Sequence, residues 1–197
     1  DEDWLPVVFY EDAEGQITIA MVANDFFSST ARKDTLAVDM AIRAGRAGAV
    51  KMAFVSSAWI SKDQEYRGKG ASNDPDRSEI VFIAYAEKPG GGPPYDVAKI
   101  ARLTSAEILR TKNVPPILGP WTDQPEGSQS DGRFAMMVTV GGTLGEIMPV
   151  IDLAAKMVRD KDKAEETLWR VAAEAMDIDP KTIDHRRVGV LDARPMI

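Results

Sequence analysis

Two apolar runs on either side of a long polar loop constrain the fold more than any other feature of this sequence. The first run covers Val50–Ile60 and contains Trp59, and the second covers Glu79–Glu87. Both are rich in apolar residues and are separated by turn residues such as Asn73-Asp74-Pro75, a pattern that predicts two buried strands. Because the two strands hold this loop between them, we expect its polar side chains to form a candidate site.

The N-terminal part has the pattern of a hairpin followed by a helix. Leu5–Tyr10 and Gln16–Ala23 are short β-prone runs joined by a polar connection that ends in glycine, and the second run shows a period of two. A helix is expected from Asp34 or Thr35 to about Ala47. Its apolar face is made of small residues, which favours close packing on a sheet.

The second half of the chain predicts one further buried strand, two helices and a short edge strand. We expect the strand over Phe134–Val140, the helices over Glu146–Arg159 and Lys163–Met176, and the edge strand over Arg187–Leu191. Tyr95–Lys112 has apolar residues at helical spacing, although alternation within it also permits a strand. We interpret this segment as a helix.

The order of these elements predicts an α+β fold, with a mainly antiparallel sheet of about five strands, helices on one face and a helical C-terminal part. The strict strand–helix alternation of a parallel sheet is missing. A length of 197 residues, 44% of them hydrophobic, fits a single domain. Within it we expect residues 1–145 to form the sheet core with the first helix, and residues 146–197 to form a helical segment packed on that core.

Composition excludes several classes of function. A formal net charge of -7 disfavours binding to nucleic acid and to anionic membranes. The absence of cysteine removes disulfides, thiolate nucleophiles, iron–sulfur clusters and the common zinc sites. The single histidine, His185, excludes His-pair metal sites, and we interpret it as a surface residue. No segment has the pattern of a membrane span or a signal peptide, so we expect a cytoplasmic protein.

The polar loop contains carboxylates that admit two interpretations. Asp74, Asp76 and Glu79 have the chemistry of Mg²⁺ or Ca²⁺ ligands, or of an acid–base pair beside Arg77. The same stretch is also good turn chemistry, because Asn and Asp side chains cap their own backbone and proline fixes φ. The glycine that an EF-hand requires is missing. We therefore favour the turn interpretation and predict no metal site.

Two tryptophans, Trp59 and Trp121, lie in or next to predicted loops. Trp59, at the end of a predicted strand, either covers the edge of the core or stands half-exposed over the loop as a stacking surface, and we favour the core interpretation. Trp121 lies in the long Pro-, Gly- and Ser-rich excursion Val114–Asp131. The candidate ligand- or partner-binding residues are therefore Trp59, Asp74, Asp76, Arg77, Glu79 and Trp121.

The stretch Gly141-Gly142-Thr143-Leu144-Gly145 follows a predicted strand and precedes a predicted helix, which is the position of a phosphate-binding loop. The dinucleotide fingerprint is incomplete, because Val140 stands where its first glycine belongs. Thr143 and Glu146 fit a capping box at the start of the helix. We favour the capping interpretation.

The strand end Ala58-Trp59 and the turn Ser72-Asn73-Asp74-Pro75-Asp76-Arg77-Ser78-Glu79 together resemble a recurring type of small, uncharacterised bacterial and phage-borne α+β protein. In that type an apolar strand ends in Ala-Trp, and a Ser-x-Asp-Pro-x-Arg-x-Glu turn precedes the next strand. The similarity covers residues 49–87, about a fifth of the chain. It implies the fold class and a common patch around this turn, and it implies no activity.

These observations favour a non-catalytic module that binds a small molecule or a protein and forms a homo-oligomer. The alternatives are an enzyme that uses Asp74, Asp76 and Glu79, with or without a divalent metal ion, and a structural or assembly protein of phage type. The sequence contains no complete nucleotide, metal or nucleophile motif that would decide among them, and it predicts no particular cofactor.

Overall fold

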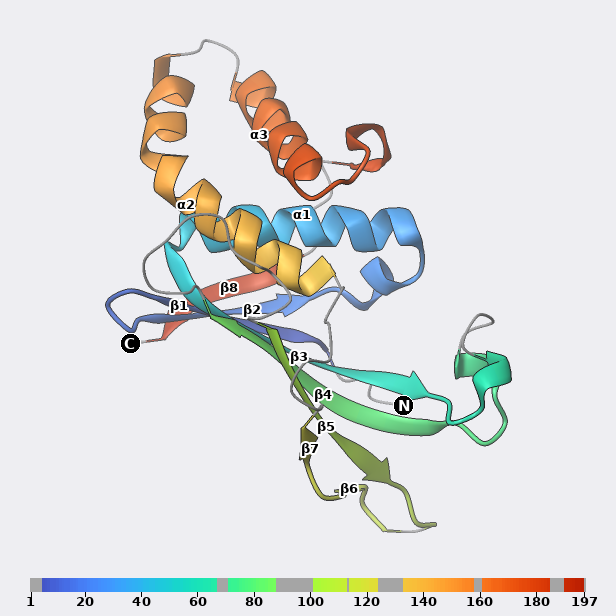
Figure 1. Ribbon diagram of the computed structural model, residues 1–197. Helices are drawn as coiled ribbons and strands as arrows, with labels where there is room; N and C mark the ends of the chain where they lie inside the picture. Colours follow the sequence, from blue (N-terminus) through green and yellow to red (C-terminus); the bar gives the residue numbers. More distant parts are fainter. Residues whose placement is uncertain are drawn as a thin grey trace.

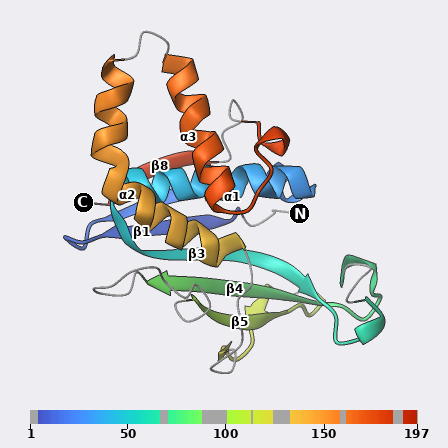
Figure 2. The same ribbon diagram turned by 45° about the horizontal axis from the view of Figure 1, so that its top comes forward.

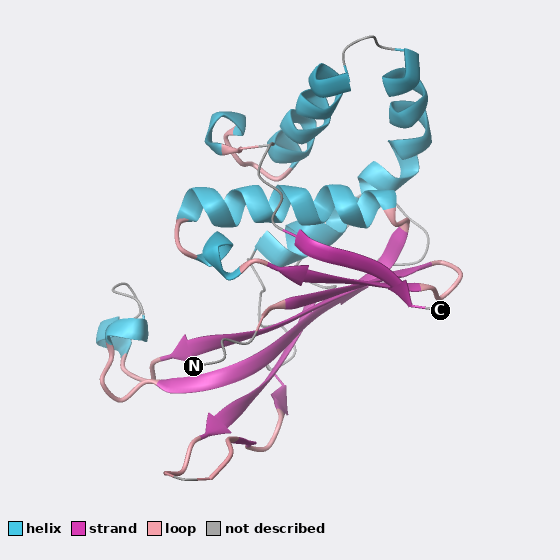
Figure 3. Ribbon diagram, turned by 180° about the vertical axis from the view of Figure 1, so that it is seen from behind, coloured by secondary structure: helices cyan, strands magenta, loops and turns pink. Residues whose placement is uncertain are grey.

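The computed structural model describes residues 5–66, 71–87, 101–112, 114–123, 133–157, 161–184 and 190–196. Over these residues the protein has an α+β fold in which helices cover one face of an antiparallel sheet (Figure 1). Seen from behind, the helices still lie on the same side of the sheet (Figure 3). The predicted fold class is confirmed. The sheet has more strands than expected, because segments predicted as helix or loop also join it.

The sheet has eight strands in the order β6-β5-β4-β3-β1-β2-β8, and β7 also pairs with β5. In chain order the strands are β1 (Val7–Asp12), β2 (Ile17–Val22), β3 (Ala49–Ile60), β4 (Ser78–Glu87), β5 (Ala101–Leu109), β6 (Ile117–Leu118), β7 (Thr122–Asp123) and β8 (Val190–Met196). Every pairing between described strands is antiparallel. The predicted C-terminal edge strand is confirmed for residues 190–191, whereas residues 187–189 lie outside the described ranges.

Both predicted strand pairs at the start of the chain are present. β1 and β2 form the N-terminal hairpin, and Gly15 in its turn has a φ of 81°, a conformation that favours glycine. β3 and β4 pair from Lys51 opposite Glu87 to Ile60 opposite Ser78, which makes them the longest ladder in the sheet. The polar loop of the sequence is therefore the connection at the end of this β3–β4 hairpin.

The first helix, α1 (Thr30–Arg46), supplies the centre of the core. It begins before the predicted Asp34, because the Ser29 side chain caps it by accepting a hydrogen bond from the backbone N–H of Arg32. Its apolar face packs on the sheet. The largest fully buried side chains of this core are Tyr10, Met40, Ile42, Met52, Val8, Val22 and Val38.

The prediction of a strand over Phe134–Val140 is wrong, because these residues belong to the helix α2 (Arg133–Met157). The glycine-rich stretch after them therefore lies inside a helix and forms neither a phosphate-binding loop nor a cap. Thr143 donates its hydroxyl to a carbonyl oxygen one turn earlier in the same helix. An apolar run of this length suits a buried helix as well as a buried strand. The helix buries Met137, Val140, Leu144 and Met148.

Glycines allow α2 to cross α1 at close range. A Cβ atom on Gly141 would lie 2.7 Å from the Cβ atom of Ala44, closer than real Cβ contacts come. A Cβ atom on Gly45 would lie 2.9 Å from the Cβ atom of Leu144. The glycines therefore serve close helix packing, for which a residue without a side chain is required. The predicted close contact of the small residues of α1 with the sheet is made with α2 instead at Ala44 and Gly45.

The second half of α2 leaves this crossing. The helix contains Pro149, which lacks a backbone N–H, and it bends near its middle so that the second half rises away from the sheet (Figure 2). The third helix, α3 (Lys161–Ala175), returns toward α1 and buries Leu168, Trp169, Ala172 and Ala173. The bend thus separates the end of α2 from the sheet core.

The prediction of a helix over Tyr95–Lys112 is wrong for Ala101–Leu109, which forms β5, and residues 95–100 lie outside the described ranges. β5 pairs with β4 from Ile80 opposite Glu107 to Ala86 opposite Ala101. Without this partner, β4 would present a long unpaired edge. Pairing with a neighbouring strand outweighs the helical spacing of the apolar residues.

Candidate functional site

The end of the β3–β4 hairpin brings an aromatic ring and a cation into contact. Trp59 stands directly opposite Glu79 in the ladder, so the two side chains share one face of the sheet. Arg77, just before β4, places its guanidinium carbon 4.6 Å from the centre of the Trp59 ring, which is a cation–π contact. The favoured interpretation of Trp59 as a cover of the core is wrong, because the residue remains 46% exposed and stands over the loop.

Asp74 fixes the turn that carries Arg77. This residue is buried, and its carboxylate accepts hydrogen bonds from the Ser61 hydroxyl and, at 2.8 Å, from the backbone N–H of Asp76. Its carbonyl oxygen accepts a third, 3.1 Å long, from the Arg77 guanidinium. The geometry therefore agrees with the turn interpretation of this stretch. Ser61 was not predicted as a site residue. The sequence feature that could have indicated it is its position directly after a predicted strand, at the start of the polar loop.

Glu79 forms an ion pair with Arg110, the residue that directly follows β5. The Nη2 and Nε atoms of Arg110 lie 2.7 Å and 2.8 Å from the Glu79 Oε2 atom. The Glu79 side chain is 17% exposed, whereas that of Arg110 is 61% exposed. The sequence reasoning also missed Arg110, because the helical interpretation of its segment did not place it beside β4.

The three carboxylates of the predicted site do not converge on one point. Asp74 binds its own turn, Glu79 binds Arg110, and the Asp76 side chain is exposed. Among the described residues, no group of three or more His, Cys, Asp or Glu side chains is arranged to hold a metal ion. The geometry here is that of an aromatic and arginine surface, which we call the hairpin tip (Trp59, Arg77, Glu79 and Arg110).

Trp121 lies apart from the hairpin tip. It directly precedes β7, which pairs with β5, so β4 and β5 lie between its backbone and that of Trp59. Three strand spacings correspond to about 14 Å. Trp121 is 47% exposed and belongs to a second surface at that edge, where Leu109 and Ile117 stand opposite each other and are also exposed.

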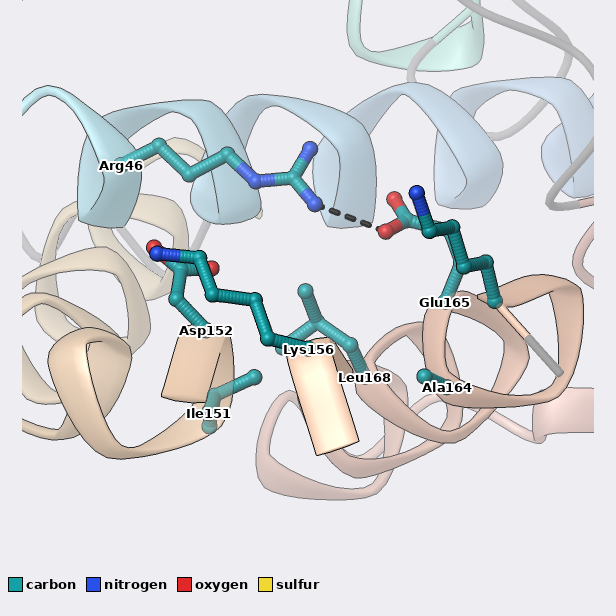
Figure 4. Close-up of a pocket in the computed structure, with 8 residues that line it drawn as sticks. Arg46, Ile151, Asp152, Lys156, Ala164, Glu165 and Leu168 are labelled. Atoms are coloured by element: carbon teal, nitrogen blue, oxygen red, sulfur yellow. Dashed lines mark hydrogen bonds and ion pairs between the residues drawn. The ribbon is translucent and has the colours of Figure 1, made fainter. Parts of the chain in front are cut away.

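A cavity of about 270 Å³ lies between the end of α1 and the facing ends of α2 and α3 (Figure 4). Arg46 of α1 reaches across it to Glu165 of α3, with 2.7 Å between Nη2 and Oε2. Glu165 also accepts a hydrogen bond of 3.3 Å from the Trp169 ring N–H. Asp152 and Lys156 of α2 line the same cavity. The ion pair between Arg46 and Glu165 therefore connects α1 to α3 across this cavity.

Two further expectations concern other parts of the chain. His185 lies outside the described residues, so its surface position stays a prediction. No helix in the described part of the chain combines the length and the apolar character needed to cross a membrane.

Comparison with known proteins gives no match: no family model, no curated protein and no solved structure is similar to this chain.

Proposed function

We propose that this protein is a non-catalytic binding module and that the hairpin tip is the surface that contacts a partner protein. The observation that carries the proposal is the contact between Trp59 and Arg77, in which a half-exposed indole ring is held by a guanidinium 4.6 Å away. Tryptophan and arginine are the residue types most enriched at the energetic centres of protein interfaces. A ring held in place before binding loses little entropy when a partner covers it.

A protein partner is favoured over a small molecule by the location of the tip. Sites for small molecules are usually concave and bury most of the ligand. Trp59 and Arg77 instead lie at the end of a hairpin that projects beyond the helices, and both residues are exposed (Figure 1). A projecting surface with an aromatic ring and the Arg77 guanidinium beside it suits a partner that offers an apolar pocket next to an acidic side chain.

The carboxylate-based enzyme finds less support in this geometry. Of its three candidate side chains, Asp74 binds its own turn, Glu79 binds Arg110 and Asp76 is exposed, so the three do not form one site. Glu79 is neutralised by Arg110. The carboxylates thus explain the shape of the tip, while the exposed ring and guanidinium groups explain what the tip offers to a partner.

The test is affinity capture from a lysate of the source cells, with bound proteins quantified by mass spectrometry. The wild type is compared with the double variant Trp59→Ala/Arg77→Ala. Trp121→Ala is the matched control, because it also removes a tryptophan of which about half is exposed. Circular dichroism confirms that each variant is folded.

We expect specific proteins captured by the wild type and by Trp121→Ala to be reduced at least about tenfold with the double variant, since hot-spot truncations cost more than 1.4 kcal/mol. Equal recovery of the same proteins by the double variant would show that the hairpin tip is not the binding surface.

A further inference from the structure

The second half of α2 carries an apolar face that its own chain leaves exposed. Ile147, Val150, Leu153 and Met157 are 43%, 69%, 61% and 81% exposed, and Ala154 between them is also exposed. We call these five residues the outer face of α2. Successive members are separated by one or three positions, and all of them lie on one side of the helix.

The opposite side of the same helix is also apolar. Leu144 and Met148 are buried toward α1, and Ile151 is partly buried against the core. The only charged residues between positions 147 and 157 are Asp152 and Lys156, and both line the cavity that faces α3 (Figure 4). Apolar residues thus cover both the side that faces α1 and the outer side, and an apolar helix surface is normally buried against another element. The outer face therefore has the character of a contact surface for a partner molecule.

The spacing on the outer face identifies the kind of partner. Ile147, Val150, Ala154 and Met157 follow one another at intervals of three, four and three residues. This alternation is the pattern of a seam between two packed helices. The absence of charge on the face disfavours nucleic acid and anionic membrane, both of which require basic residues.

We propose that the outer face of α2 packs against the same face of a second copy, with the two helices antiparallel around a two-fold axis near position 152. In that arrangement Val150 of one copy meets Ala154 of the other, and Ile147 meets Met157. Two smaller side chains then face each other near the axis and two larger ones face each other at each end. The seam is thus complementary to itself, as a two-fold interface requires.

The available surface is sufficient for such a dimer. The exposed parts of the five side chains amount to roughly 500 Å² per copy, so pairing removes on the order of 1,000 Å² of apolar surface, about the lower limit of specific interfaces. The bend at the middle of α2 is consistent with this arrangement, because it moves the second half of the helix away from the sheet (Figure 2). The proposed dimer uses none of the residues of the hairpin tip, so it can be tested independently of the proposed function.

The test is sedimentation velocity on the full chain at concentrations on the order of 1 to 100 µM, which bracket a micromolar Kd. The wild type is compared with Val150→Glu and with Met157→Glu. Both positions are exposed in one copy, so these substitutions leave the fold of that copy intact. Val171→Glu on α3 is the matched control, because it makes the same change at an exposed helical position outside the outer face.

We expect the wild type and Val171→Glu to sediment as dimers. Val150→Glu and Met157→Glu each weaken the dimer by about 100-fold or more, because pairing would bury unpaired carboxylates. A wild type that is monomeric throughout this range overturns the proposal, whether the face is unused or is covered by another protein. So does a dimer that both glutamate substitutions leave unchanged.

Discussion

The guanidinium carbon of Arg77 lies 4.6 Å from the centre of the Trp59 ring, and the two residues stand at opposite ends of the connection between β3 and β4. Their contact closes the end of the hairpin. It depends on the Asp74 turn, since the Asp74 carbonyl oxygen accepts a hydrogen bond from the same guanidinium. The exposed contact between Trp59 and Arg77 is therefore supported by a buried aspartate.

We first predict that Arg77 and Trp59 are energetically coupled. In a double-mutant cycle with Arg77→Ala and Trp59→Leu, the coupling free energy should be about 0.5–1 kcal/mol, as for cation–π contacts at exposed sites. Urea unfolding of the wild type, both single variants and the double variant measures it. Purely additive effects would mean that the ring and the guanidinium are adjacent without stabilising each other.

The second prediction separates the two aspartates of the turn. Asp74→Ala should lower the free energy of unfolding by about 1–3 kcal/mol, because it leaves the Ser61 hydroxyl and the Asp76 backbone N–H without their acceptor. Asp76→Ala is the matched control and should change it by less than about 0.5 kcal/mol, since the Asp76 side chain is exposed. Urea unfolding compares them, and amide exchange at position 76 should accelerate only in Asp74→Ala. Equal effects of the two substitutions would refute the role given to Asp74.

Local patterns predicted the strands around the hairpin tip because those strands are paired with neighbours in sequence. Val50–Ile60 and Glu79–Glu87 are apolar runs that are separated by turn residues and pair with each other, so sequence and structure agree there. The run Phe134–Val140 has a similar composition, and it becomes a helix because of a distant feature, the small residues of α1. Only contact with Gly45 explains why glycines are favourable inside α2.

The same distinction explains the candidate site. Trp59, Asp74 and Arg77 lie on one hairpin, and the sequence was sufficient to group them. Arg110 reaches Glu79 only through the pairing of β5 with β4, which the helical spacing of the segment concealed. The outer face of α2 lies within the predicted helix Glu146–Arg159, but which side of that helix its own chain leaves exposed became apparent only in the folded chain.

The third prediction concerns the crossing of α1 and α2. Gly141→Ala should lower the free energy of unfolding by about 1–3 kcal/mol, because overpacking outweighs the gain of about 1 kcal/mol in helix propensity. Gly145→Ala is the graded control, since its Cβ atom would lie 3.3 Å from the nearest atom, compared with 2.7 Å for Gly141. Its effect should be smaller. Thermal and urea unfolding measure both, and a Gly141→Ala variant more stable than Gly145→Ala would contradict the close crossing.

The last prediction uses Tyr10, whose side chain lies in the core near the ion pair of Asp39 and Arg43. The Tyr10 hydroxyl is buried and has no hydrogen-bond partner among the described residues. Burial and, secondarily, the Asp39 carboxylate raise the pKa of Tyr10 well above its usual value near 10. Asp39 itself is paired with Arg43 at 3.0 Å.

Tyr10→Phe should therefore leave stability at pH 7 unchanged or increase it by about 1 kcal/mol, because it removes a buried hydroxyl without a partner. At alkaline pH the raised pKa of Tyr10 determines whether the free energy of unfolding rises or falls with pH. The unfolded chain releases this proton near pH 10 while the folded protein keeps it, so Tyr10 makes the free energy of unfolding fall with rising pH by up to about 1.4 kcal/mol per pH unit. In urea unfolding at pH 8, 10 and 11, the free energy of unfolding should fall less steeply with pH for Tyr10→Phe than for the wild type. Tyr66→Phe is the control, because it removes the hydroxyl of a half-buried tyrosine in the hairpin loop. Parallel declines for the wild type and Tyr10→Phe would exclude Tyr10 as a source of alkaline instability.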